Sequence, residues 1–137
     1  MLSPYSEVPL KNSFIKYIDI SINIDIIETI MNQNQLLEIF SVLSNKTRLN
    51  ILLWLKAPQK NFPPQGIHLD KSVDLKGGVC AGSIYEKSGI AQSTISHYLD
   101  MLINCGLLLS ERHGKWVYFR RNEVLIKNLK EFLDDNL

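Results

Sequence analysis

Between residues 33 and 55 the apolar positions recur every three or four residues, the spacing that gathers them on one face of a helix. The spacing breaks at Ser44 and Asn45, and either side chain could cap a following helix by accepting a hydrogen bond from its first N–H groups. A helix over 33–43 is therefore predicted, followed by a second that begins at Lys46. Pro58 ends the second helix, because the residue before a proline is driven away from the helical conformation.

Residues 58–78 keep no sustained period and contain three prolines and three glycines. A loop of this length is unusual in a compact domain and often has a function of its own. Closing a loop becomes only slowly more costly as it lengthens, so a surface insertion is also well tolerated. The sequence favours the surface insertion. Metal binding by His68, Asp70 and Asp74 is an alternative, although sparse polar residues in a loop are usually only solvated.

Residues 80–104 have the pattern of two helices joined by a tight turn. The first helix begins at about Cys80 and is stopped by Gly89. The second covers 92–104, with apolar residues at relative positions i, i+3, i+4 and i+7. Gly106 follows where a left-handed C-terminal cap is wanted. This order predicts a helix-turn-helix.

Two strand-like segments, 107–112 and 116–121, come next and flank His113, Gly114 and Lys115, whose glycine suits a hairpin turn. A hairpin in this position is the wing of a winged helix-turn-helix. The last predicted element is an amphipathic helix with a wide apolar face, formed by Val124, Leu125, Ile126, Leu129, Phe132 and Leu133. So wide a face on a short helix suggests burial against another surface, such as a second subunit.

Residues 17–26 alternate apolar and polar side chains, the pattern of a half-buried strand, and apolar positions up to Met31 indicate that a helix takes over. We therefore predict an N-terminal extension over residues 1–32, a strand followed by a helix. Residues 33–137 are predicted to form a winged helix-turn-helix DNA-binding and dimerisation domain. The predicted fold class is mainly α with a small β-hairpin wing (α+β), in a dimeric protein.

Composition and charge refine this picture. A chain of 137 residues suits one domain, and no apolar run approaches the roughly 20 residues of a membrane-spanning helix. Two cysteines make no disulfide framework and the N-terminus has no secretory pattern, so we expect a cytoplasmic protein without membrane contacts. The net charge of +1 divides into −3 over 1–43, +6 over 44–121 and −2 over 122–137. Positive charge is thus concentrated in the predicted helix-turn-helix and wing, where phosphate contacts would be made.

The N-terminal residues of a recognition helix enter the major groove of DNA. Here the candidate base contacts are short or planar hydrogen-bonding side chains: Gln92, Ser93, Thr94, Ser96 and His97. Glutamine can pair bidentately with adenine, while serine and threonine can meet several base edges. For Ser93 a capping role explains the hydroxyl equally well, because it stands near the start of the helix. Arg112 and Lys115 flank the hairpin tip and could reach phosphates or the minor groove.

Three segments carry a resemblance to a known family: FSVLSNKTRLNILLWL (40–55), SGIAQSTISHYLDMLINCGLL (88–108) and RHGKWVYFR (112–120). In this order they resemble the ArsR/SmtB family of bacterial winged-helix repressors, over roughly residues 33–130. The resemblance implies a homodimer built mainly from the first and last helices, which binds double-stranded DNA at an inverted-repeat (palindromic) operator. It also implies repression of its own or a neighbouring promoter. Many relatives release DNA when a metal ion or another inducer binds.

The sequence departs from this family at the inducer sites. Metal-binding relatives often carry a Cys-x-Cys pair before the recognition helix, and here Cys80 matches the first position while Gly82 stands at the second. One thiolate cannot hold a soft metal ion, and no histidine follows His113 to form the family's other site on the last helix. We therefore predict neither a metal nor another cofactor. Cys80 and Cys105 could instead make the protein redox-responsive, although Cys105 could equally be a small buried residue.

Two other classes of function compete with DNA binding. A protein-interaction module that keeps the winged helix as a dimerisation scaffold would fit the modest net charge. An enzyme is disfavoured, because the three histidines, two cysteines and scattered acids show no spacing of nucleophile, base and orienting group. Sequence-specific transcriptional regulation without the usual family metal sites remains the leading hypothesis.

Overall fold

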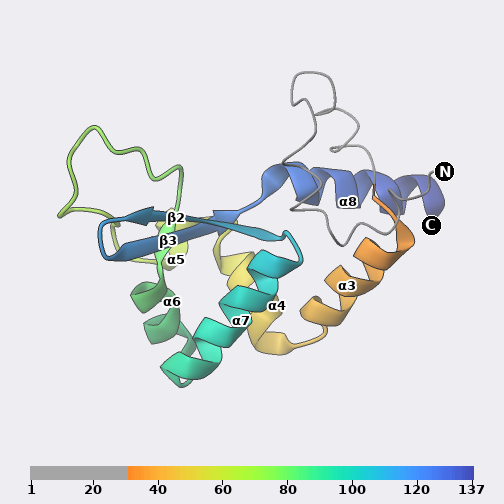
Figure 1. Cartoon of the computed structure of the whole chain (residues 1–137), viewed down its shortest axis with the longest axis horizontal. Coiled ribbons are helices and arrows are strands. Elements are labelled where there is room, and N and C mark those ends of the chain that lie inside the picture. The colour runs from red at the N-terminus through yellow and green to blue at the C-terminus, as the bar shows by residue number, and fades with distance from the viewer. Residues whose placement is uncertain (1–30) are drawn as a thin grey trace.

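The computed structural model describes residues 31–137, so the predicted strand and most of the predicted helix of the N-terminal extension lie outside the described residues. Figure 1 shows a helix-rich chain with one small sheet, which confirms the predicted mainly α fold with a small β wing. The elements are α3 (Gln33–Leu43), α4 (Lys46–Trp54), α5 (Pro58–Asn61), β1 (Val79–Cys80), α6 (Ala81–Ser88), α7 (Gln92–Asn104), β2 (Leu108–His113), β3 (Trp116–Arg121) and α8 (Glu123–Asn136).

The first two described helices begin at asparagine caps. Asn32 and Gln35 form a capping box at α3, in which each side chain accepts a hydrogen bond from the other residue's backbone N–H, at 2.8 and 3.2 Å. Asn45 caps α4 by accepting from the backbone N–H of Arg48 at 3.0 Å. Of the two predicted caps, Asn45 is therefore the residue that acts at α4.

The segment predicted as a structureless loop from residue 58 onward begins instead with one helical turn, α5. Pro58 occupies its first turn, where a missing N–H costs no helical hydrogen bond and the fixed φ suits the helix. The preceding helix, α4, ends earlier than predicted, at Trp54 with Leu55 as its C-cap, so Pro58 starts α5 but does not end α4. A single turn has no periodicity from which it could have been predicted.

The helix-turn-helix consists of α6 and α7. Gly89 caps α6 in the left-handed conformation, with φ 67°, and α7 spans the predicted residues 92–104. Gly106 has φ 89°, in agreement with its predicted role after α7. The glycine positions and the apolar spacing therefore predicted the bounds of both helices to within one residue.

The wing is part of a three-stranded antiparallel sheet in the order β1-β3-β2. His113 pairs with Trp116, so the turn holds two residues rather than three, and Gly114 provides the positive φ, 63°, at its first position. β1 was not predicted, because a strand of two residues exists only through its pairing with β3.

The core lies where the helices meet one face of the sheet. Its fully buried side chains come from almost every described element and include Ile39, Ile51, Val79, Ile84, Ile95, Leu102, Leu107 and Leu108. In Figure 1, α4, α6 and α7 lie on one side of the sheet, while α3 and α8 lie at the end opposite the hairpin turn. None of the helices in residues 31–137 is long and apolar enough to cross a bilayer.

Asn122 joins the foot of the wing to both neighbouring helices. Its Oδ1 accepts from the backbone N–H of Leu125 at 3.2 Å and caps α8, while its Nδ2 donates to the carbonyl of Gly106 at 2.9 Å. We expect Asn122→Ala to lower the free energy of unfolding by about 1–3 kcal/mol, because a cap is lost and a half-buried carbonyl loses its donor. Chemical denaturation measures this, with Asn34→Ala on the exposed side of α3 as the control. Equal midpoints for the two variants would contradict the bridging role.

Candidate nucleic-acid interface

Helix α7 presents opposite faces to the core and to solvent. Ile95, Leu99 and Leu102 are buried and hold the helix against the rest of the domain. On the other side, Gln92, Ser93, Ser96 and His97 are exposed and Thr94 is half-buried. All five predicted base-contact residues therefore lie on the same helix, and four of them are exposed.

The structure resolves the two interpretations of Ser93. Ala91 is the N-cap of α7, and no side chain forms a capping hydrogen bond there. The capping role that the sequence allowed for Ser93 is therefore wrong. Its exposed hydroxyl is available for contacts outside the chain.

Of the two predicted wing cations, Arg112 lies near the end of β2 and Lys115 is the second residue of the hairpin turn. Arg112 and Lys115 are both exposed, and neither forms an ion pair within residues 31–137. The guanidinium of Arg112 lies 3.5 Å from the carbonyl oxygen of Gly114, and the Lys115 ammonium lies 5.2 Å from the centre of the Trp116 ring. Both cationic side chains are therefore accessible to an anionic ligand.

Three other side chains of the wing, Glu111, His113 and Arg121, form hydrogen-bonded pairs within the chain. His113 Nε2 lies 2.6 Å from Glu111 Oε1, and this hydrogen bond lowers the pKa of the Glu111 carboxyl below its ordinary value. Because the pKa is lowered in the folded state, the pair stabilises the protein above the carboxyl's ordinary pKa and loses this effect as the pH falls through the lowered one. Arg121 forms two hydrogen bonds with Glu123, at 2.9 and 3.2 Å, which hold this cation at the foot of the wing.

The cysteines lie at opposite ends of the helix-turn-helix. Cys80 is the half-buried N-cap residue of α6, and its Sγ lies 3.3 Å from Ser83 Oγ. Cys105 is buried at the end of α7, where its Sγ donates to the carbonyl of Leu102 at 3.5 Å. Their redox role stays a prediction.

The side chains considered for hard-metal binding serve other purposes in the loop. Asp70 accepts from the backbone N–H and hydroxyl of Ser72, and Asp74 accepts from the backbone N–H of Lys76. His68 instead contacts Tyr118 and Trp116 of the wing. Across residues 31–137 no group of three or more His, Cys, Asp or Glu side chains could hold a metal ion.

Comparison with known proteins agrees with this geometry. Residues 75–110 match the family model of the bacterial regulatory protein, arsR family. The uncharacterized HTH-type transcriptional regulator YbzH of Bacillus subtilis (strain 168) is 43% identical over 98 residues, which cover 71% of this chain and 93% of the relative.

Two solved structures show the same fold. An ArsR-like transcriptional regulator from Rhodococcus sp. RHA1 is similar with a TM-score of 0.55 and 21% identity, over 74% of this chain and 78% of the other. A homodimeric winged helix-turn-helix DNA-binding domain from Mycobacterium bovis is similar with a TM-score of 0.51 and 22% identity, over 74% and 80% of the two chains.

Proposed function

The chain belongs to the ArsR family of bacterial transcriptional regulators, and we propose that it is a repressor that binds an inverted-repeat operator as a homodimer. The exposed polar face of α7 is the observation that carries this proposal. This face carries exposed hydrogen-bond donors and acceptors, while the other face of the helix is buried against the core. The wing adds two unpaired cations, Arg112 and Lys115, for the phosphate backbone.

Selection of bound fragments from genomic DNA tests the proposal. We expect enrichment of a palindromic sequence, bound at least about a thousandfold more tightly than scrambled DNA at physiological salt. A reporter gene behind the selected operator should be expressed less when the protein is present. Equal affinity for operator and scrambled DNA would contradict the proposal and favour the protein-interaction module.

The homodimer is supported by exposed apolar side chains on α3 and α8. Leu37 is 62% exposed, Phe40 43% and Val124 50%, and large apolar groups left in water usually mark an interaction surface when they gather. The two helices lie at the end of the molecule opposite the wing (Figure 1). A two-fold axis at this end would present the recognition helices of both subunits to one DNA duplex, about 34–36 Å apart.

We expect Leu37→Asp to convert the dimer into a monomer, because a carboxylate would be buried without a partner in the interface. Light scattering coupled to size-exclusion chromatography measures the mass of the particle. Leu53→Asp is the matched control, since Leu53 is 54% exposed on α4, outside the proposed interface. If both variants keep the dimer mass, the interface lies elsewhere.

For the signal that releases DNA, we propose thiol oxidation over metal binding. Cys80 is half-buried at the start of α6, so a change at its sulfur could alter the helix that precedes the recognition helix. Repeating the operator-binding measurement with peroxide, zinc, copper, arsenite and a chelator tests this choice. Release by peroxide that is abolished in Cys80→Ser supports it, and release by a metal ion overturns it.

A further inference from the structure

The long loop between α5 and β1 is tied to the helix-turn-helix at one point. Gln65 Oε1 accepts from the backbone N–H of Cys80 at 2.9 Å, and its Nε2 donates to Ser83 Oγ at 3.1 Å. Both partners lie at the start of α6, fifteen or more residues further along the chain. A surface insertion that has no role in the domain would not require these two hydrogen bonds to α6.

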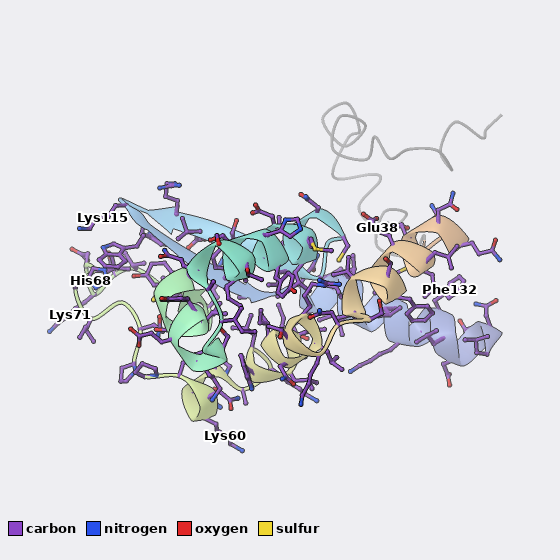
Figure 2. All side chains as sticks on the ribbon, turned by 90° about the horizontal axis from the view of Figure 1, so that it is seen from below. Glu38, Lys60, His68, Lys71, Lys115 and Phe132 are labelled. Carbon is purple, nitrogen blue, oxygen red and sulfur yellow. The ribbon has the colours of Figure 1, made fainter. Side chains whose placement is uncertain are left out.

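A second attachment holds the loop against the wing. The His68 ring lies 4.5 Å from the Trp116 ring, centre to centre, and His68 Nε2 is 3.3 Å from the hydroxyl of Tyr118. Burial raises the pKa of the Tyr118 hydroxyl, which therefore stays protonated. Trp116 directly follows Lys115 in the turn. The middle of the loop and the tip of the wing thus share one end of the molecule, where Figure 2 shows His68, Lys71 and Lys115.

The two lysines of this loop are exposed, whereas its two aspartates accept hydrogen bonds from backbone N–H groups. Lys71 and Lys76 are exposed, and neither forms an ion pair within the described part of the chain. The carboxylates of Asp70 and Asp74, in contrast, accept backbone N–H groups of the loop itself. Lys71 lies at the same end of the molecule as Lys115 (Figure 2) and adds a cation there, while the neighbouring Asp70 carboxylate accepts the backbone N–H and hydroxyl of Ser72.

We propose that the loop tip, residues 67–72, is an additional DNA-contacting element, in which His68 positions Lys71 to bind phosphates on the flank of each half-site. This inference rests on the proposed function. Glu38 of α3 and Phe132 of α8 lie at the far end from Lys71 in Figure 2, so a dimer joined there directs both loops outward. The contacted phosphates therefore lie outside the inverted repeat.

Titration of operator binding against salt tests the contact. In the full chain, Lys71→Ala should reduce the slope of log K against log salt by about 0.9 and weaken binding roughly five- to tenfold at 0.1 M salt. The loss should be equal on operator and scrambled DNA, because a phosphate contact carries no sequence information. Lys60→Ala is the matched control, since this exposed lysine of α5 lies well apart from Lys115 in Figure 2. It should leave the slope unchanged.

Two further measurements separate the contact from indirect effects. On a duplex trimmed to the inverted repeat, wild type and Lys71→Ala should bind equally. His68→Ala should reduce the salt slope in the wild-type background but not in the Lys71→Ala background, as expected of a positioning residue. If wild type binds the operator while Lys71→Ala keeps the slope of Lys60→Ala, this inference is wrong and the proposed function stands. If wild type does not discriminate the operator, the proposed function itself fails.

Discussion

Replacing Gln92 with alanine should weaken operator binding by roughly 5- to 140-fold, since one bidentate contact to a base is worth about 1–3 kcal/mol. Gln92 is exposed at the first position of α7, the end of a recognition helix that reaches base edges. Affinity for scrambled DNA should change little, because phosphate contacts supply non-specific binding. Fluorescence anisotropy with both duplexes, at one salt concentration, measures the two affinities.

The control for this variant is Gln33→Ala. Gln33 is likewise exposed and likewise the first residue of a helix, α3, which lies at the opposite end of the molecule from the wing (Figure 1). Any loss of helix-terminal stability should be similar in the two variants, whereas the loss of operator affinity should occur only in Gln92→Ala. Equal losses on operator and scrambled DNA would show that Gln92 does not read a base.

The largest effect on stability is expected from Ile95→Ala. Ile95 is 1% exposed and belongs to the buried cluster that fixes α7 against the core. Truncating a large aliphatic side chain at such a site removes buried apolar surface and leaves a cavity, at a cost of about 2–5 kcal/mol. Unfolding in guanidinium chloride, followed by circular dichroism, measures the difference.

Ser96→Ala is the neighbouring control for Ile95→Ala. Ser96 is exposed on the same helix, so its loss should change the free energy of unfolding by no more than about 0.5 kcal/mol. If Ser96 contacts DNA, the control variant should still lose operator affinity. The two adjacent residues would then separate the folding role of α7 from its binding role. A stable Ile95→Ala protein would contradict the placement of α7 in the core.

Short-range patterns predicted the helices of the winged domain well. The apolar spacing and Gly106 placed α7 at its observed bounds, and alternation around Gly114 located both strands of the hairpin to within one residue. These features depend on residues close together in the chain. The exposure of the polar face of α7 follows from the same periodicity, because one face must be buried for the helix to be held.

The long loop shows where prediction from sequence stopped. Composition favoured a surface insertion, yet Gln65 bonds to the start of α6 and His68 to the wing. His68 and Tyr118 are fifty residues apart. Neither residue carries a local signal of its partner, since a histidine in a polar loop is compatible with many environments.

Periodicity, capping and turn chemistry act over a few residues, so the amino-acid order sufficed to predict the helix-turn-helix, the wing and the polar face of α7. Three features could be seen only in the folded chain: the pairing of Val79 and Cys80 with β3, the absence of a cap by Ser93, and the contact of the loop with the wing. Those outcomes depend on packing between segments distant in the chain. Because that packing brings His68 to Trp116, it also places Lys71 at the same end of the molecule as Lys115.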